Sequence, residues 1–501
     1  MTAEGYGNAT GAVSAPCRPA AKPWPLVAIL ILVSLIKALI LATSGPSISP
    51  DSPEYVLYAD AILDHGQAFG PLVWDGNPKP TFVFRPPGYP LILAAAKLIA
   101  GDQYAYLTVV IQSAVNFIAI WLMFRVALRL LRSPRAALIA VLLYAGSTSI
   151  LWDNSILSDS LYASLWNIVI FGLVGQLIGC WRLKFYQYCG LGLLWGGSLW
   201  LRDVGIYFTL FPVLLFLLLA ANKQTQWRSV IAGVAAFTIV TFAFVGGLVL
   251  LNFQRTGQAF YSITGAVNWW RPAFDMTKFQ YAQPFAGDDL ISRTVRDTVS
   301  DYDYPDVIKF LYEFQRRCQC TPVQVQSLGF AAYRSLVFHY PIAYARLVLR
   351  YLNYFALGEL LTDPVSTINQ LFELGSVRPE WRLPGLSLRN LSALRKDFSI
   401  ETLMLMLVNA IAEVASAMLF SLYLFGTPYV LLKWARQGGA KSGDWLAFGF
   451  MWFSFIGVAA ALSLVHFEAR YALPILPAGI LGTVFVSQCL LRFRRGAALH
   501  L

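Results

Sequence analysis

Apolar segments long enough to cross a bilayer recur from one end of this sequence to the other. The first runs over residues 24–43, and a transmembrane helix needs about 20 predominantly apolar residues. Charged residues make up only 13% of the chain and hydrophobic residues 57%, whereas a soluble domain carries about 25% charged residues. The sequence therefore predicts an all-α polytopic membrane protein.

The apolar pattern predicts about ten transmembrane helices. They are expected at residues 24–43, 104–131, 135–152, 160–181, 186–201, 205–221, 229–251, 401–433, 445–465 and 471–491. Residues 89–100 are too few to span and are predicted to form an interfacial or re-entrant helix. Residues 338–361 carry Arg346 and Arg350 one helical turn apart, and each mid-span charge would cost about 2.5–3.5 kcal/mol on insertion. We therefore expect this segment to lie on the surface.

Basic residues gather at one set of span ends. They include Arg125, Arg129, Arg132, Arg135, Arg182, Lys184, Lys223, Arg228, Lys433, Arg436, Lys441, Arg492, Arg494 and Arg495. The positive-inside rule makes this side cytoplasmic, and it explains the net charge of +11 without nucleic-acid binding. We expect a multi-pass protein of the plasma (inner) membrane, with both termini inside and its site on the extracytoplasmic, or periplasmic, side.

This topology divides the chain into four parts. Residues 1–23 are predicted to be a disordered cytoplasmic tail. Residues 24–251 form an N-terminal transmembrane module whose first outer loop covers 44–103. Residues 252–400 form an extracytoplasmic region with an interfacial helix, and residues 401–501 form a C-terminal transmembrane module.

Charged side chains collect on the predicted outer face. The carboxylates are Asp51, Glu54, Asp153 and Asp159, and the cations are Arg85, Arg202 and Arg470, with His466 and Glu468 beside the last. The span interiors are nearly free of charge, whereas an ion-coupled transporter needs ionisable residues near the middle of the membrane. A site at the outer interface can take a lipid-linked phosphate from the bilayer and a polar acceptor from outside.

Such a site suits glycosyl transfer from a polyprenyl-phosphate sugar. The reaction needs a general base for the acceptor hydroxyl and cations for the leaving phosphate, and arginine serves the second task through its fork of donors. Two other classes stay open. A flippase for lipid-linked glycans would translocate without cleavage, and a non-catalytic scaffold for envelope assembly would tolerate loss of Asp51, Asp159 and Arg85 together.

The motifs on this face have a recognisable order. They are Asp51 after the first span, Arg85-Pro-Pro-Gly-Tyr89-Pro, Leu157-Ser158-Asp159, Leu201-Arg202, and Glu468-x-Arg-Tyr-x-x-Pro-x-x-Pro477. Together they resemble the GT-C membrane glycosyltransferases, and the branch they look like is that of aminoarabinose transferases and protein O-mannosyltransferases. Bacterial relatives in this branch add sugars to lipopolysaccharide or cell-envelope glycans. The resemblance covers most of residues 24–205 and the last 35 residues.

The resemblance implies an inverting transfer from a polyprenyl-phosphate sugar to an envelope glycolipid, glycan or protein. It implies Asp51 and Asp159 as catalytic acids, with Asp51 as base or acceptor-positioning residue. Arg85, Arg202 and Arg470 would contact the donor phosphate, and Glu54, Tyr89, His466 and Glu468 are candidates for supporting roles. Ser52 stands where some members carry a second acid, so Glu54 is an alternative base. No residue is assigned to a metal, and the resemblance leaves open whether a divalent cation serves as a cofactor.

Several of these residues also allow a structural reading. Asp51 and Asp159 could cap helices, and Arg85 could anchor at lipid headgroups. Local ion pairs are the alternative for the two remaining arginines, between Arg202 and Asp203 and between Arg470 and Glu468. His466 could be a structural or interfacial histidine.

Features outside the motifs have two readings as well. Lys37 lies inside the first apolar segment and either snorkels to the interface or pairs with a buried carboxylate. Trp74 and the pair Trp269-Trp270 suit sugar stacking or an interfacial belt. Cys318 and Cys320 are expected to be free or locally bridged, since they lack the spacing of a zinc site. Residues 301–306, DYDYPD, could bind a divalent ion or form a solvated turn.

Overall fold

The structure is a computed structural model. It describes residues 24–49, 51–65, 72–74, 77–79, 85–147, 149–222, 227–300, 304–305, 307–358, 400–437, 442–466 and 469–494. The expected tail at 1–23, most of the acidic stretch 301–306, Glu468 and residues 359–399 lie outside the described residues.

Helices make up nearly all of the described chain, as the sequence predicted. They are α1 (Trp24–Ser44), α2 (Ser52–His65), α3 (Gly88–Ala100), η1 (Gly101–Gln103), α4 (Tyr104–Leu131), α5 (Pro134–Ala145), α6 (Ser149–Asp153), α7 (Ser158–Leu177), α8 (Phe185–Leu201), η2 (Asp203–Thr209), α9 (Leu210–Ala221), α10 (Trp227–Thr256), α11 (Thr264–Lys278), α12 (Leu290–Asp297), α13 (Val307–Cys318), α14 (Pro322–His339), α15 (Pro341–Gly358), α18 (Ile400–Arg436), α19 (Gly443–Val465), η5 (Ala469–Ala472) and α20 (Leu476–Arg494). Two small antiparallel ladders pair β1 (Leu72–Trp74) with β2 (Asn77–Lys79) and β3 (Val299–Ser300) with β4 (Tyr304–Pro305).

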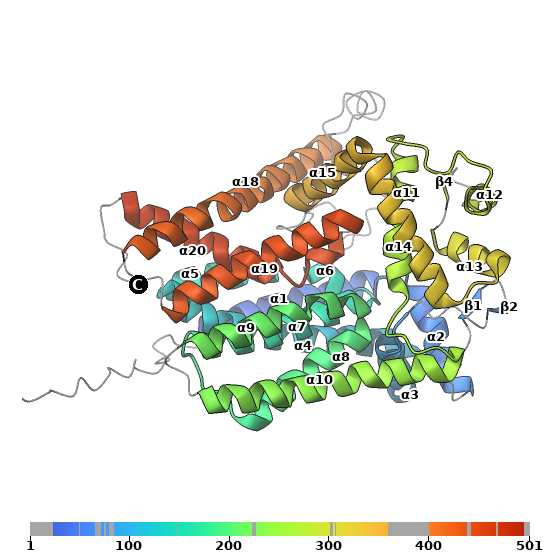
Figure 1. The fold of residues 1–501 in the computed structure, drawn as a ribbon. Helices are drawn as coiled ribbons and strands as arrows, with labels where there is room; N and C mark the ends of the chain where they lie inside the picture. Colours follow the sequence, from blue (N-terminus) through green and yellow to red (C-terminus); the bar gives the residue numbers. More distant parts are fainter. Residues whose placement is uncertain are drawn as a thin grey trace, which may run out of the picture.

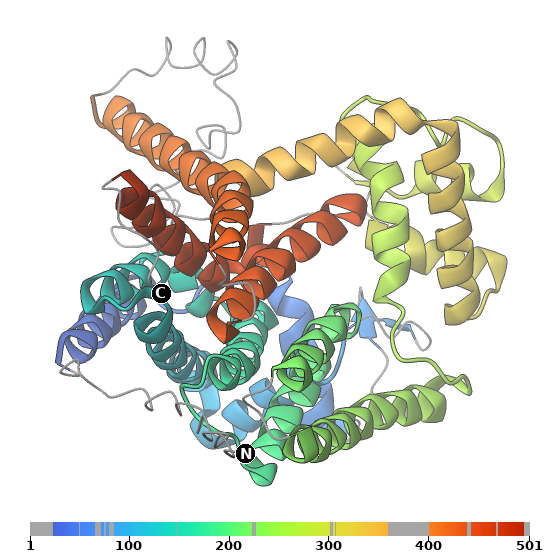
Figure 2. The same ribbon diagram turned by 60° about the vertical axis from the view of Figure 1, so that its left-hand side comes forward.

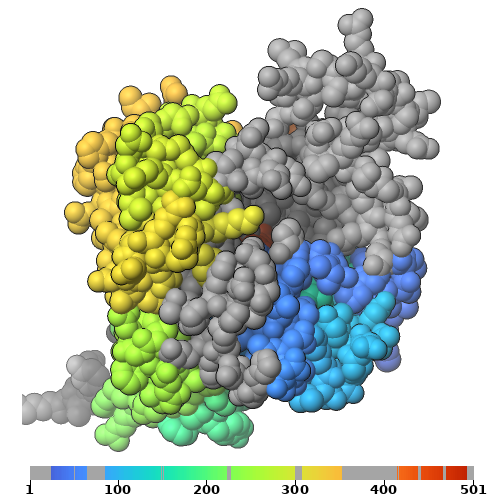
Figure 3. Space-filling model, turned by 90° about the vertical axis from the view of Figure 1, so that its right-hand side faces the viewer, coloured from blue at the N-terminus to red at the C-terminus, as the bar shows by residue number. Residues whose placement is uncertain are grey.

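The long helices run side by side along one direction, and α11 and α14 run across that direction at one end (Figure 1 and Figure 2). We call the region from α11 to α14, residues Thr264–His339, the cap. Seen from this end, the cap lies beside the segments that follow α1 (Figure 3). The elements that carry the predicted site therefore meet at the capped end of the bundle.

Seven helical segments of the described chain are long and apolar enough to cross a membrane. They are Trp24–Thr43, Gly88–Leu131, Ser158–Leu177, Asp203–Ala221, Trp227–Gln254, Ala417–Arg436 and Gly443–Val465. Pro134–Ala145 and Leu476–Arg492 are apolar but shorter, and α8 has 17 residues. The multi-pass architecture is thus confirmed, whereas a count of ten spans is not.

The predicted span at 135–152 is wrong as one continuous helix. α5 ends at Ala145, and the short α6 begins at Ser149. The carbonyl of Tyr144 accepts hydrogen bonds from the hydroxyls of Ser147 (2.6 Å) and Ser149 (3.1 Å). Serine side chains that bond nearby backbone compete with helical hydrogen bonding, so the helix stops here despite an apolar sequence.

Gly88 explains the close approach of α3 to the end of α8. A Cβ at Gly88 would lie 2.6 Å from the backbone oxygen of Trp200, which no side chain tolerates. The Arg-Pro-Pro-Gly run thereby brings Arg85 near the chain that leads into Arg202.

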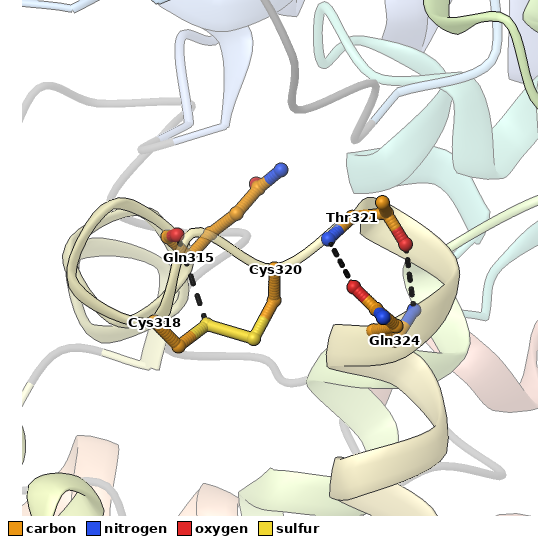
Figure 4. Close-up of a disulfide and its surroundings, with 5 residues drawn as sticks. All are labelled: Gln315, Cys318, Cys320, Thr321 and Gln324. Atoms are coloured by element: carbon orange, nitrogen blue, oxygen red, sulfur yellow. Dashed lines mark hydrogen bonds between the residues drawn. A yellow bond between two sulfur atoms is a disulfide. The ribbon is translucent and has the colours of Figure 1, made fainter.

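The cap has a hydrophobic core of its own. Trp270 and Phe274 of α11 pack on Phe310 of α13 at centroid distances of 5.1 and 5.3 Å. A disulfide joins Cys318 to Cys320 between the end of α13 and the start of α14 (Figure 4). Thr321 then caps α14 in a capping box with Gln324. Of the two readings for these cysteines, the structure has the local bridge.

α15 corresponds to the segment that we expected to lie on the surface. It is not among the seven segments of the described chain that could cross a membrane. Arg346 is exposed, and the guanidinium of Arg350 lies 3.8 Å from the ring centre of Phe279. That this helix lies at the interface stays a prediction.

Candidate active site

Two loops that follow α1 and α6 are joined by backbone and serine hydrogen bonds. The amide of Ser47 donates to the carbonyl of Asn154 (2.9 Å), and the amide of Ile156 donates back to Ser47 (2.9 Å). The hydroxyl of Ser52 donates to the carbonyl of Ile156 (2.9 Å). Asp51 precedes Ser52 and Asp159 lies at the start of α7, so these bonds bring the two acids to one place.

A chain of ion pairs links three arginines to three carboxylates there. Nη2 of Arg470 lies 2.7 Å from Oδ2 of Asp51, and Nη2 of Arg85 lies 3.0 Å from Oδ1 of the same residue. Nε of Arg85 also donates to Glu54 at 2.8 Å. The structure therefore brings Asp51 of the first loop into contact with an arginine that lies about 420 residues away in the chain.

Asp159 forms the second half of this chain. It pairs directly with Arg202, and Nε of Arg470 lies 3.8 Å from its Oδ1. Arg202 thus pairs with Asp159, while the carboxylate of its sequence neighbour Asp203 accepts a hydrogen bond from Ser262. Arg470 connects the two halves because it contacts both Asp51 and Asp159. We call these six residues the charge cluster: Asp51, Glu54, Asp159, Arg85, Arg202 and Arg470.

The members of the charge cluster differ in exposure. The side chain of Asp159 is 2% exposed, whereas that of Asp51 is 22% exposed. Burial opposes the charge on Arg85, yet the pKa of Arg85 is raised above its ordinary value, because Tyr55, Asp51 and Glu54 surround the guanidinium. Arg85 is consequently a permanent cation. Of the two aspartates, Asp51 is more accessible to solvent than Asp159.

Tyr471 adds an aromatic ring that sequence reasoning did not single out. The guanidiniums of Arg202 and Arg470 lie 4.7 and 5.7 Å from its ring centre. Both guanidiniums are attracted to the π face of this ring. Its place directly after Arg470 in the last motif was the available signal.

A second polar network lies behind the charge cluster. Lys37 of α1 pairs with the buried carboxylate of Asp153, which also accepts a hydrogen bond from Ser160. Of the two readings for Lys37, the structure has the buried pair. Tyr89 donates to Oε1 of Gln112 (2.7 Å), whose Nε2 donates to the carbonyls of Asp153 (2.9 Å) and Ser155 (3.0 Å).

This network fixes the loop that precedes Asp159. Tyr89 is fully buried and touches the ring of Tyr55 at a centroid distance of 5.0 Å. The hydroxyl of Tyr55 in turn lies 2.9 Å from the hydroxyl of Ser158. Tyr89 therefore acts as a positioning residue for the loop. Gln112, which was not predicted from the sequence, connects Tyr89 to the backbone of this loop.

His466 belongs to a third group, which ties the cap and α15 to the end of α19. Its Nδ1 lies 3.6 Å from Oδ2 of Asp275, which also pairs with Arg271 (3.2 Å) and accepts a hydrogen bond from Tyr351. Burial alone would raise the pKa of Asp275, but His466, Arg271 and Tyr351 hold the pKa below its ordinary value. Asp275 was not predicted, because a single acid on an amphipathic helix gives no signal. Glu468 lies outside the described residues, so its pairing with Arg470 stays a prediction.

A cavity of about 260 Å³ opens beside these groups. Its apolar walls include Trp166, Phe208, Val458 and Leu462, and its charged side chains are Arg202, Asp203 and Arg470, with His466 beside them. Within the described part of the chain, no group of three or more His, Cys, Asp and Glu side chains is placed to hold a metal ion. Guanidiniums beside apolar walls suit a molecule with an anionic head and an apolar body.

No protein-family model and no curated protein matches this chain. Among solved structures it is similar to the oligosaccharyltransferase of Archaeoglobus fulgidus in its apo form, with 14% identity and a TM-score of 0.47 over 95% of this chain. It is also similar to that protein tethered with an acceptor peptide, with 13% identity and a TM-score of 0.48 over 95% of this chain. The chain spans about half the length of these proteins, 52% and 51%.

A further similar structure is ArnT from Cupriavidus metallidurans bound to undecaprenyl phosphate. It shares 16% identity and a TM-score of 0.36, over 92% of this chain and 78% of that one. These neighbours are GT-C membrane glycosyltransferases, the group that the sequence motifs resemble.

Proposed function

We propose that this chain is an inverting membrane glycosyltransferase that takes its sugar from a polyprenyl-phosphate donor. The observation that carries the proposal is the charge cluster at one wall of an apolar cavity. Arg202 and Arg470 line the cavity, and each pairs with a carboxylate beside it. The apolar walls suit an isoprenoid chain, and two guanidinium forks suit its phosphate.

In the proposed reaction, a carboxylate takes the proton of the acceptor hydroxyl while the hydroxyl oxygen bonds to the anomeric carbon of the sugar. The bond between this carbon and the phosphate oxygen breaks on the opposite face, and its electron pair leaves with the polyprenyl phosphate. The configuration at the anomeric carbon is therefore inverted. Arg202 and Arg470 stabilise the charge that develops on the leaving phosphate.

Asp51 is the acid that we propose as the base. Its side chain is more exposed than that of Asp159, so an acceptor hydroxyl can approach it. Glu54, the alternative base, is held by Arg85 at 2.8 Å. We assign Asp159 the task of holding Arg202 and Arg470 toward the phosphate.

Donor binding changes the ion pairs in this scheme. Arg470 bridges Asp51 and Asp159, and in this scheme it turns from Asp51 toward the phosphate when the donor enters, while Asp159 stays beside it. Asp51 then keeps Arg85 as its partner, and a carboxylate beside one guanidinium is a stronger base than one beside two. Arg85 is already held by two acids, so its direct contact with the phosphate stays a prediction.

We propose that the acceptor is an envelope glycolipid such as lipopolysaccharide, a glycan or a protein, and that the site faces the extracytoplasmic side of the plasma membrane. Two observations support this side. The disulfide of Cys318 lies in the cap, and disulfides persist in oxidising compartments. Arg129 and Arg132 belong to the basic span ends that the positive-inside rule assigns to the cytoplasm, and they lie near Asp444 at the first turn of α19. Arg470 follows the last turn of α19 and so lies at the other end of this helix.

The test is transfer by the purified full-length protein in proteoliposomes. The probe is an undecaprenyl-phosphate hexose labelled in the sugar, with isolated envelope glycolipid as acceptor. We expect undecaprenyl phosphate to be released and label to enter the glycolipid. Asp51→Asn should abolish release, and Asp64→Asn, at an exposed position of α2, the helix that follows Asp51, should leave it unchanged. Labelled lipid that crosses the bilayer without cleavage would overturn the proposal in favour of a flippase.

A further inference from the structure

The cavity has one wall that is neither apolar nor charged. This wall comes from the first turns of α11, where Thr264, Gly265, Asn268 and Trp269 line the cavity. Positions four apart lie on the same face of a helix, so these residues form one stripe of α11. We call it the α11 stripe. It carries the amide of Asn268 and the indole of Trp269, whereas α19 lines the cavity with Val458, Ala461 and Leu462.

The two adjacent tryptophans of α11 have different surroundings. Trp270 is 1% exposed and packs inside the cap against Phe310. Trp269, one position earlier in α11, lines the cavity instead. Its ring contacts Phe330 and Tyr333 of α14 at centroid distances of 5.0 and 5.1 Å. Trp269 is therefore a fixed aromatic surface at the cavity, and Trp270 is part of the core.

The charges around the cavity restrict what can lie against the α11 stripe. Among the described residues that line the cavity, Asp203 is the one acidic side chain, and its carboxylate accepts a hydrogen bond from Ser262. Arg202, Arg470 and His466 supply the basic groups. An ammonium group in this cavity would meet the guanidiniums of Arg202 and Arg470, and the carboxylate of Asp203 is buried beside Arg202 and Ser262. An anionic group other than the phosphate would compete with it for the two arginines.

We infer that the α11 stripe binds the sugar of the donor and that this sugar is uncharged, without an amino or carboxyl group. The inference rests on the proposed donor, and it assigns the sugar-binding side of the cavity to α11 and the lipid side to α19. The C–H groups of a neutral sugar pack on the indole of Trp269, and its hydroxyls bond the amide of Asn268. Trp269 and Asn268 are thus the residues that determine donor specificity.

The test compares four lipids that share one tail and one phosphate. They are undecaprenyl phosphate alone and undecaprenyl phosphate carrying a neutral hexose, an aminopentose or a hexuronic acid. Each displaces labelled undecaprenyl phosphate from the full-length protein in nanodiscs. We expect the neutral sugar to tighten binding about tenfold relative to undecaprenyl phosphate, which corresponds to roughly 1.4 kcal/mol, and the charged sugars to give no gain. A gain with the aminopentose that equals or exceeds the neutral sugar would overturn the inference.

Variants separate this inference from the proposed function. Trp269→Ala and Asn268→Ala should each reduce the gain from the neutral sugar while the affinity for undecaprenyl phosphate itself is unchanged. Trp269→Phe, which keeps an aromatic ring against Phe330, should retain part of the gain and guards against misfolding of the alanine variant. Trp227→Ala, at an exposed position at the start of α10, is the matched control. If undecaprenyl phosphate does not bind at all, the proposed function fails; if it binds and Trp269→Ala leaves the sugar gain intact, the α11 assignment alone fails.

Discussion

Two groups of buried charge lie near each other in this protein, and they differ in what their charges face. The pair of Lys37 and Asp153 is enclosed, and Ser160 and Ser113 complete it. The charge cluster has three arginines and three acids, and Arg202 and Arg470 also line a cavity. A closed pair positions a loop, whereas guanidiniums at a cavity wall can exchange a carboxylate for a ligand. Burial of charge alone therefore does not mark a site.

The largest expected effect comes from breaking the closed pair. Lys37→Met leaves Asp153 buried without a counter-charge, and loss of one partner of a buried pair costs about 3–5 kcal/mol. We expect a strong fall in the midpoint of thermal unfolding in detergent. Lys97→Met, which breaks the more exposed pair with Asp60, should change stability by no more than about 1 kcal/mol. Equal effects of the two variants would contradict the difference between closed and exposed pairs.

A smaller effect is expected from a mild change in the charge cluster. Arg470→Lys keeps a cation beside Asp51 and Asp159 but loses the guanidinium fork that we propose contacts the donor phosphate. Hydrogen bonds to charged groups contribute about 1.5–3 kcal/mol, so the KM for an undecaprenyl-phosphate hexose should rise about ten- to hundredfold. The unfolding midpoint should move little. The control is Arg296→Lys in α12, whose side chain is largely exposed, and a KM shift of equal size there would refute the assignment.

The apolar spans and the site's constituents were predictable for different reasons. Hydropathy summed over about 20 residues is a strong signal, and charges in an apolar chain stand out, so Asp51, Asp159 and Arg470 could be proposed together. Their pairing could not, because it depends on hydrogen bonds between two short loops. Serines such as Ser47 and Ser52 occur in any loop and carry no periodic pattern.

Other features could not be predicted from the sequence, for related reasons. Gln112 and Asp275 each lie within a helix, and their partners come from distant parts of the chain. The end of α5 depends on hydroxyls that bond the carbonyl of Tyr144, which hydropathy does not register. Trp269 and Trp270 are indistinguishable in the sequence until the packing of the cap separates them.

A third prediction concerns the network that joins the two groups. Tyr89→Phe removes the hydrogen bond to Gln112 and should lower stability by about 1 kcal/mol. Because Gln112 holds the loop before Asp159, kcat should fall several-fold while KM for the donor stays near its original value. Tyr106→Phe, at an exposed position of α4, serves as control. A change in KM alone would show that Tyr89 acts on donor binding instead.

The smallest effect is expected at Asp275 and is confined to acid. The pKa of Asp275 is lowered in the folded protein relative to about 3.9 in an unfolded chain. Its charge therefore stabilises the fold above that value, and this stability is lost as the pH falls through the folded pKa. The unfolding midpoint of Asp275→Asn should consequently depend less on pH between 5 and 2 than that of the wild type. Parallel curves would exclude this contribution.

The central claim is that Arg202 and Arg470 hold the phosphate of a polyprenyl lipid in the cavity. Native mass spectrometry of the full-length protein with added undecaprenyl phosphate tests it most directly. The wild type should retain one lipid per chain, and Arg202→Gln combined with Arg470→Gln should lose it while circular dichroism stays unchanged. Retention of the lipid by the double variant, or no binding by the wild type, would contradict the account.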